Sequence, residues 1–196
     1  FWDAKNITFS HIFRNGNLLI GTRNRLYLST DSLKTIKEIA VKNPDGSDYL
    51  PHVPKHPDYP GWYFFTLPGE NAWMINGKEM LVWGNYSNVE GGAVPVNIYY
   101  SIDNGHTVKI AYSFGQNPRF KDNGDGKDKS EGTLLGNPDN PKFCRHIHCV
   151  TYNPGEDAFY ACTGDGRPSE GAQQECKWLK GRYNADKDEW TWEVLI

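Results

Sequence analysis

Two histidines separated by a single residue are the side chains best suited to chemistry in this sequence. They stand in the run Arg145-His146-Ile147-His148, at the start of a β-rich segment. Imidazole changes charge near neutral pH, so a histidine oriented by a carboxylate can act as a general acid or base. Asp165 ends the next β-rich run and is the candidate carboxylate. We therefore expect His146, His148 and Asp165 to be the catalytic residues, if the protein is an enzyme.

The segment that carries these residues has the pattern of a β-hairpin. Two β-rich runs flank the pair Pro154-Gly155, which together with the acidic residues behind it is typical of a turn. We expect Tyr152 to pair with Phe159 across this turn, which fixes the register of the whole hairpin.

That register makes a prediction about the histidines. It places His146 opposite Asp165, and His148 opposite Thr163. Side chains alternate between the two faces of a strand, so the two histidines should share one face. The hairpin would then carry one polar patch.

Three interpretations of this patch remain open. It could be a hydrogen-bonded polar lining, a substrate or acid–base site, or a divalent-metal site. Two imidazoles and a carboxylate suit zinc, and His11 is the candidate third histidine ligand. We expect no resident metal or other cofactor. The candidate substrate-binding residues are His11, Arg145 and Arg167.

A second motif concerns structure more than chemistry. Ser101, Asp103, Gly105 and Thr107 follow one another at every second position, between two β-rich runs. Ser and Asp side chains can bond the backbone N–H groups of their own turn, and Gly supplies a positive φ at no steric cost. The spacing therefore predicts a tight hairpin turn.

An imperfect copy of this motif occurs earlier in the chain. It keeps Ser29, Asp31 and Thr35 but has Leu33 where the first copy has glycine. A third site, around Asp186, keeps only the aspartate. Three copies of one turn indicate a repeated unit.

The motif resembles the Asp-box, the bacterial neuraminidase repeat. The resemblance implies an all-β fold, a β-propeller of four-stranded antiparallel blades of the sialidase-like superfamily, with each box between the third and fourth strands of a blade. It also implies a glycan as ligand and glycoside hydrolysis as the activity. Sialidases of this group carry a Phe/Tyr-Arg-Ile-Pro motif, and Phe13-Arg14-Asn15-Gly16 is the nearest match here. Because Ile-Pro is missing, we expect a specificity other than sialic acid; the alternative is a non-catalytic propeller that binds carbohydrate or protein.

The elements that position these residues fall into three sets of four predicted strands. We expect one partial propeller domain over residues 1–196, with blades at about 5–42, 62–114 and 145–195 and long loops at 43–60 and 115–142. The second strands of the sets end in Gly21, Gly84 and Gly164. The predicted strands are 8–13, 18–22, 26–29 and 36–41, then 62–67, 80–84, 96–101 and 107–113, then 145–152, 158–164, 177–183 and 190–195.

Three blades cannot close a ring, because propellers have about four to eight. We therefore expect half of a six-bladed ring, or part of a larger one, with the missing blades supplied by further chain or a second copy. The end sheets, in residues 1–40 and 176–196, should then present apolar faces. A four-bladed ring with a disguised blade in 43–80 is the alternative.

Composition excludes some partners. The formal net charge is −3, which gives no electrostatic basis for binding nucleic acid. No apolar run approaches the ~20 residues that span a bilayer.

The chain opens on Phe1 without Met, so we expect a processed product, extracellular or periplasmic. Its four cysteines lack any C-x-x-C pair, which favours free thiols, with one or two disulfides as the alternative. The acidic run 122–128 reads as a solvated loop more readily than as a calcium loop.

Overall fold

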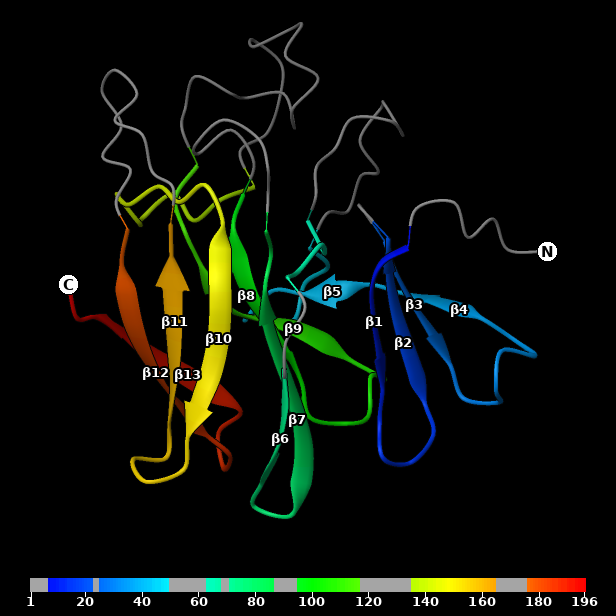
Figure 1. Cartoon of the computed structure of the whole chain (residues 1–196). Helices are drawn as coiled ribbons and strands as arrows, with labels where there is room; N and C mark the ends of the chain where they lie inside the picture. Colours follow the sequence, from blue (N-terminus) through cyan, green and yellow to red (C-terminus); the bar gives the residue numbers. More distant parts are fainter. Residues whose placement is uncertain are drawn as a thin grey trace, which may run out of the picture.

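The computed structural model describes residues 7–22, 25–49, 63–67, 71–86, 95–116, 135–164 and 176–196. Within these ranges the chain forms thirteen β-strands and no helix, in three sheets that lie side by side (Figure 1). The predicted all-β fold is therefore confirmed at this level. The three sheets do not close into a ring in the described part of the chain, and the propeller arrangement stays a prediction. None of these residues belongs to a helix that could cross a membrane.

The first sheet has the strand order β1-β2-β3-β4, with every neighbouring pair antiparallel. Its strands are β1 (Ile7–Ile12), β2 (Leu18–Thr22), β3 (Leu26–Ser29) and β4 (Lys37–Ile39). Gly16, at a φ of 90°, turns the chain between β1 and β2. All four predicted strands are found, and Asp31 lies between the third and the fourth, as expected.

The second sheet has the order β5-β9-β8-β7-β6. Its antiparallel strands are β6 (Ala72–Ile75), β7 (Lys78–Gly84), β8 (Asn97–Ser101) and β9 (Val108–Ser113). The short strand β5 (Val41–Lys42) follows the first sheet in the chain but pairs parallel to β9. The chain thus passes directly from the last strand of the first sheet into the edge of the second.

The predicted first strand of this set, 62–67, is wrong. Its described part, 63–67, is not a strand, and the first strand of the sheet is β6 instead. Tyr63 and Phe64 lie in a loop, but their side chains are buried in the core, so the segment has the apolar composition of a strand. The pair Asn76-Gly77 is the turn signal that the prediction overlooked. Both residues have positive φ and form the two-residue turn between β6 and β7.

The third sheet has the order β10-β11-β12-β13, again fully antiparallel. It consists of β10 (Ile147–Asn153), β11 (Ala158–Thr163), β12 (Trp178–Asn184) and β13 (Glu189–Val194). All four were predicted to within about two residues.

Two apolar cores hold the sheets together, one on each face of the second sheet. Phe9 of β1 stacks on Trp83 of β7 with ring centroids 5.1 Å apart. On the other face, Val82 and Tyr100 lie in one cluster with Phe159 of β11. The second sheet is thus buried on both faces, which explains why its strands read as continuous apolar runs.

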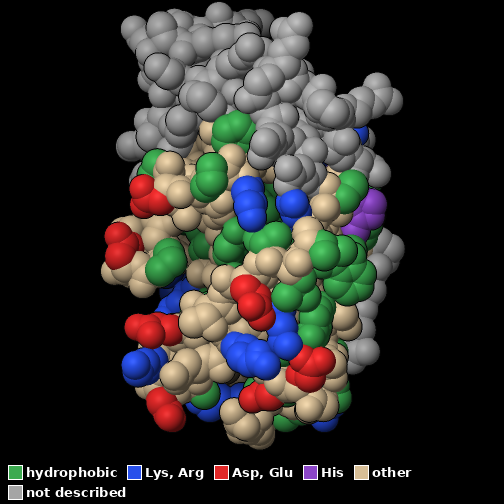
Figure 2. All heavy atoms as spheres, turned by 90° about the vertical axis from the view of Figure 1, so that its left-hand side faces the viewer, with side chains coloured by type: hydrophobic (Ala, Val, Ile, Leu, Met, Phe, Trp, Pro, Cys, Tyr) green, Lys and Arg blue, Asp and Glu red, His purple; other side chains and the backbone are tan. Residues whose placement is uncertain are grey.

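The third sheet is different, and one expectation about it is wrong. Its face away from the second sheet is polar, because residues such as Arg182, Glu189 and Glu193 alternate along β12 and β13 with the side chains that face the core. Figure 2 shows charged side chains of both signs spread over this side. Trp178, at 49% exposure, is an apolar exception. The apolar end face expected in residues 176–196 is therefore not found, whereas the first sheet does expose Ile7 and Ile12.

Candidate functional site

The predicted pair of histidines is in contact at the start of β10. The Nε2 atoms of His146 and His148 lie 3.0 Å apart, within hydrogen-bond distance. His146 is buried, whereas His148 is only half-buried. At this separation one ring must donate its N–H to the lone pair of the other, because two imidazolium ions so close would repel each other. The contact therefore joins a buried ring nitrogen to one on the half-buried His148, and the tautomers of the two rings decide which nitrogen donates.

Tyr86 covers the pair from the second sheet. Its ring stacks on His146, with centroids 4.1 Å apart and an angle of 17° between the planes, and meets His148 edge to face at 5.9 Å. A half-buried aromatic ring over two imidazoles gives a site with one apolar wall and titratable nitrogens beneath it.

The segment before Tyr86 explains how the ring is positioned. Gly84 ends β7, and a Cβ on it would lie 2.5 Å from Ile147 Cγ2, so only glycine allows β10 to come this close. Asn85 O then accepts a hydrogen bond from Ile147 N at 3.1 Å. The side chain of Asn85 is itself fixed, because its Oδ1 accepts from Asn97 N at 2.6 Å and its Nδ2 donates to Pro95 O. Tyr86 is consequently held against the first strand of the next sheet.

A second glycine shapes the site from the opposite side. Gly164 follows β11, and a Cβ on it would lie 2.4 Å from His148 Nε2. Glycine here leaves room for the imidazole of the neighbouring strand. The role of Gly84 and Gly164 could have been suspected from their repeated place at the ends of second strands, but Tyr86 itself was not predicted.

The predicted register holds only in part of the hairpin. Tyr152 pairs with Phe159 and Cys149 with Cys162, as expected, but a bulge between Ile147 and Cys149 shifts the rest by one residue. Thr163 is therefore opposite Ile147, and the prediction that it faces His148 is wrong. The expected pairing of His146 with Asp165 loses its basis with this shift. Asp165 and Arg167 lie outside the described residues.

The bulge has a physical reason. Two residues of β10 oppose one of β11, which lets the strand bend where it meets Gly84 and Asn85 of the second sheet. Arg145, the residue before the pair, is half-buried at the start of this bend.

His11 does not join the histidine pair. Its Nε2 lies 3.2 Å from Glu79 Oε1, and the other oxygen of Glu79 accepts a 2.7 Å hydrogen bond from Arg14 N. It lines a separate cavity of about 540 Å³ together with Ser10 and Asn71. No three His, Cys, Asp or Glu side chains of the described ranges gather in a way that could hold a metal ion. His11 is thus paired with Glu79 and is not grouped with His146 and His148 in the described residues, and the metal interpretation of the pair stays a prediction.

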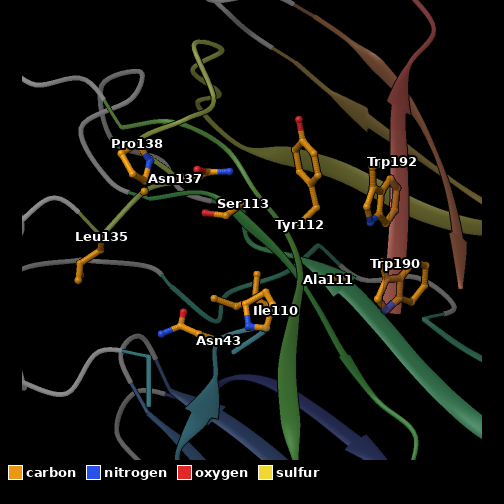
Figure 3. Close-up of a pocket in the computed structure, with 12 residues that line it drawn as sticks. Asn43, Ile110, Ala111, Tyr112, Ser113, Leu135, Asn137, Pro138, Trp190 and Trp192 are labelled. Carbon is orange, nitrogen blue, oxygen red and sulfur yellow. The ribbon is translucent and has the colours of Figure 1, made fainter. Parts of the chain in front are cut away.

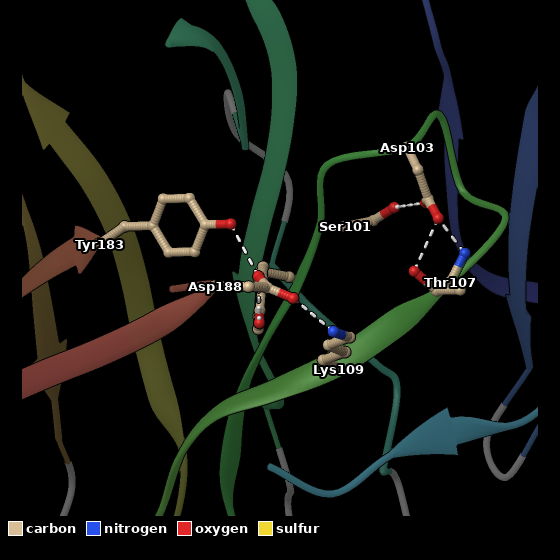
Figure 4. A network of polar contacts seen from close by, with 7 residues as sticks. Ser101, Asp103, Thr107, Lys109, Tyr183 and Asp188 are labelled. Carbon is tan, nitrogen blue, oxygen red and sulfur yellow. Dashed lines mark hydrogen bonds and ion pairs between the residues drawn. The ribbon is translucent and has the colours of Figure 1, made fainter. Parts of the chain in front are cut away.

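The turns Ser101–Thr107 and Ser29–Thr35 have the same hydrogen bonds. In the second sheet, Asp103 Oδ1 accepts from Thr107 N at 2.9 Å and from Ser101 Oγ at 3.1 Å, and its Oδ2 accepts from Thr107 Oγ1 at 2.7 Å (Figure 4). Ser101 Oγ in turn accepts from Gly105 N at 3.1 Å.

In the first sheet, Ser29, Asp31 and Thr35 repeat this pattern, with distances between 2.6 and 3.1 Å. The hydrogen bonds from Thr35 lower the pKa of Asp31. These residues stabilise turns and do not line the histidine site.

The turn between β12 and β13 uses an acidic residue to contact the neighbouring sheet. Asp188 Oδ1 accepts hydrogen bonds from Tyr183 OH at 2.7 Å and from Tyr100 OH at 2.9 Å, and Oδ2 pairs with Lys109 (Figure 4). Tyr100 and Lys109 belong to the second sheet, so this turn docks the third sheet onto it. The sequence prediction, centred on Asp186, missed this contact.

All four cysteines are free thiols in the structure, with no disulfide between them. Cys149 and Cys162 face each other across β10 and β11 with their Sγ atoms 3.2 Å apart. Burial raises the pKa of the Cys144 thiol, which donates to His146 O. Cys144 therefore acts as a small buried side chain beneath the histidine site.

Comparison of the chain with protein-family models, with curated proteins and with solved structures gives no match.

Proposed function

We propose that the chain is part of a sialidase-like Asp-box propeller that binds a glycan at the cluster of Tyr86, His146 and His148. Two turns with the same Ser, Asp and Thr hydrogen bonds, each between the third and fourth strands of a run of four consecutive antiparallel strands, support the propeller assignment. The observation that carries the binding site is the contact of the two histidines under the ring of Tyr86.

The chemistry of the cluster suits a sugar. A tyrosine face can stack on the C–H groups of a pyranose ring, and imidazole nitrogens both donate to and accept from hydroxyl groups. Tyr86 and His148 are half-buried and so keep part of their surface open to a ligand, whereas His146 supports them from below.

Cleavage of a glycosidic bond is the second candidate, and the 3.0 Å contact of the two Nε2 atoms favours it. One imidazole, when protonated, can give its proton to a leaving oxygen and become neutral, while the 3.0 Å contact with its neighbour holds the ring in place. Such an enzyme would need a carboxylate as its second group, at one of the two glycosidase separations. In either case we propose an extracellular or periplasmic location, and further blades from more of the chain or from a second copy.

His148→Ala tests the binding site. We expect it to abolish binding of the glycans that the wild-type chain retains in a screen of immobilised oligosaccharides, or their cleavage, with little change in the midpoint of urea unfolding. The matched control is His106→Ala, because His106 is an exposed histidine in the Asp-box turn of the second sheet. If His148→Ala unfolds the protein, or leaves glycan binding equal to the control, the histidines are structural and the proposal fails.

A further inference from the structure

A cavity lies between β9 of the second sheet and β13, the edge strand of the third sheet, and none of the described histidines lines it. Its volume is about 490 Å³, within the roughly 300–1,000 Å³ typical of ligand pockets. Figure 3 shows Trp190 and Trp192 of β13 on one side, Tyr112 of β9 between, and the segment with Asn137 and Pro138 opposite. We call this the outer groove.

Its aromatic side is a continuous strip. Trp190 and Trp192 stand two residues apart on β13, so they share one face of the strand, and their rings are stacked with centroids 5.4 Å apart. Tyr112 extends the strip, with its ring 5.8 Å from that of Trp192. All three are only half-buried, although they adjoin the core.

The polar groups of the outer groove are neutral. The described residues that line it include Asn43, Ser113 and Asn137, and none of them is Asp, Glu, Lys or Arg. Tyr112 OH accepts a 2.9 Å hydrogen bond from Asn140 Nδ2, which leaves the hydroxyl proton of Tyr112 to be donated. The indole N–H of Trp192 is buried and has no hydrogen-bond partner in the part of the chain that the structure describes.

From this combination we infer that the outer groove binds an uncharged oligosaccharide. Stacked aromatic faces bind the apolar faces of pyranose rings, while the amides and the hydroxyls of the groove match sugar hydroxyls. A charged glycan would have to leave water without gaining an ionic partner, which is unfavourable. The inference extends the proposed glycan binding to a second site and does not depend on the histidine cluster.

The test follows the indole N–H signals of Trp190 and Trp192 in ¹⁵N-labelled protein, assigned through Trp190→Phe and Trp192→Phe. The probes are uncharged hexasaccharides of glucose, mannose, xylose and galactose, with hexagalacturonate as the charged comparison. We expect at least one uncharged probe to shift both signals in a saturable way, and hexagalacturonate to leave them unchanged.

Two variants place the binding in the groove. Ala111→Phe, which adds bulk to the β9 wall, should weaken binding of that probe about tenfold. Thr191→Phe is the matched control, because Thr191 lies between the two tryptophans on β13 and is exposed on the opposite face, and it should leave affinity unchanged.

His148→Ala separates this inference from the proposed function, since it should abolish binding at the histidine cluster and leave the Trp190 and Trp192 shifts intact. If no uncharged probe moves the two signals, if hexagalacturonate moves them equally, or if Ala111→Phe binds as Thr191→Phe does, the outer groove is not a carbohydrate site.

Discussion

Leu33 and Gly105 occupy the same position of the two turns that share the Ser, Asp and Thr hydrogen bonds, but their surroundings differ. Each donates its backbone N–H to the box serine, and each has a positive φ, 68° for Leu33 and 84° for Gly105. A Cβ on Gly105 would lie 2.7 Å from the ring of Phe13, because this turn packs on the first sheet. Leu33 is 52% exposed. The box therefore tolerates a side chain only where no sheet lies against the turn.

Leu33→Gly is expected to stabilise the protein by about 0.5–1 kcal/mol. The left-handed conformation costs an L-residue about 1–2 kcal/mol, of which the greater chain entropy of unfolded glycine takes back part. Urea unfolding monitored by tryptophan fluorescence measures the change.

Gly105→Ala is the counterpart at the same turn position. It should destabilise by about 2–4 kcal/mol, from φ strain together with the overlap with Phe13. If Gly105→Ala costs no more free energy of unfolding than Leu33→Gly gains, the packing of the second turn on the first sheet is contradicted.

The contact between the two histidines was predictable from their spacing, because residues two apart on a strand point to the same face. Its surroundings were not. The bulge at Ile147–Cys149 lies where β10 contacts another sheet, and Tyr86 reaches the site from 60 residues upstream. Such contacts leave no local pattern in the sequence, apart from the repeated glycines at 84 and 164.

At the scale of elements, apolar content predicted strands well where one sheet packs on another. Most strands of the first and third sheets were placed to within two residues. The error at 62–67 arose because aromatic residues in a buried loop have the same composition as a strand. The polar face of the third sheet was visible in the alternation of residues 189–194, and the expectation that a further blade covers this sheet led to the wrong prediction.

The turn between β12 and β13 gives a prediction about pH. Burial alone would raise the pKa of Asp188, but hydrogen bonds from Lys109, Tyr183 and Tyr100 lower it below its usual value. A carboxyl group whose pKa is depressed in the folded state stabilises above its unfolded pKa, about 3.9, and loses that contribution as the pH falls through the folded pKa.

Asp188→Asn should therefore cost about 1–2 kcal/mol near neutral pH, at the low end because Lys109 is partly exposed and screened by solvent. The difference from wild type should shrink below about pH 4. Urea unfolding at several pH values measures it, with Asp186→Asn, an exposed neighbour in the same turn, as control. A difference that is constant from neutral to acid pH would show that the carboxylate charge does not dock the two sheets.

At the scale of the molecule, the second sheet is the centre, because apolar cores cover both of its faces. The third sheet meets it at Gly84, where Ile147 fills the space that a side chain would take. Ile147 is 2% exposed and also donates its N–H to Asn85, the residue before Tyr86. Docking of the sheets and assembly of the histidine site therefore depend on the same contact.

A double-mutant cycle tests this dependence. Gly84→Ala should destabilise by about 1–3 kcal/mol through overlap with Ile147. Ile147→Ala alone should cost about 2–5 kcal/mol by leaving a cavity.

In the double variant the new methyl enters that cavity, so the two costs should fall short of their sum by about 1–2 kcal/mol, as measured by urea unfolding. Costs that add within about 0.5 kcal/mol would contradict the contact between β7 and β10.

Because Gly84→Ala pushes β10 away from Asn85, it should also lift Tyr86 from His146 and weaken any glycan binding that His148→Ala removes. Binding in the outer groove, by contrast, should depend on Asp188 and Lys109, which hold β13 and β9 together.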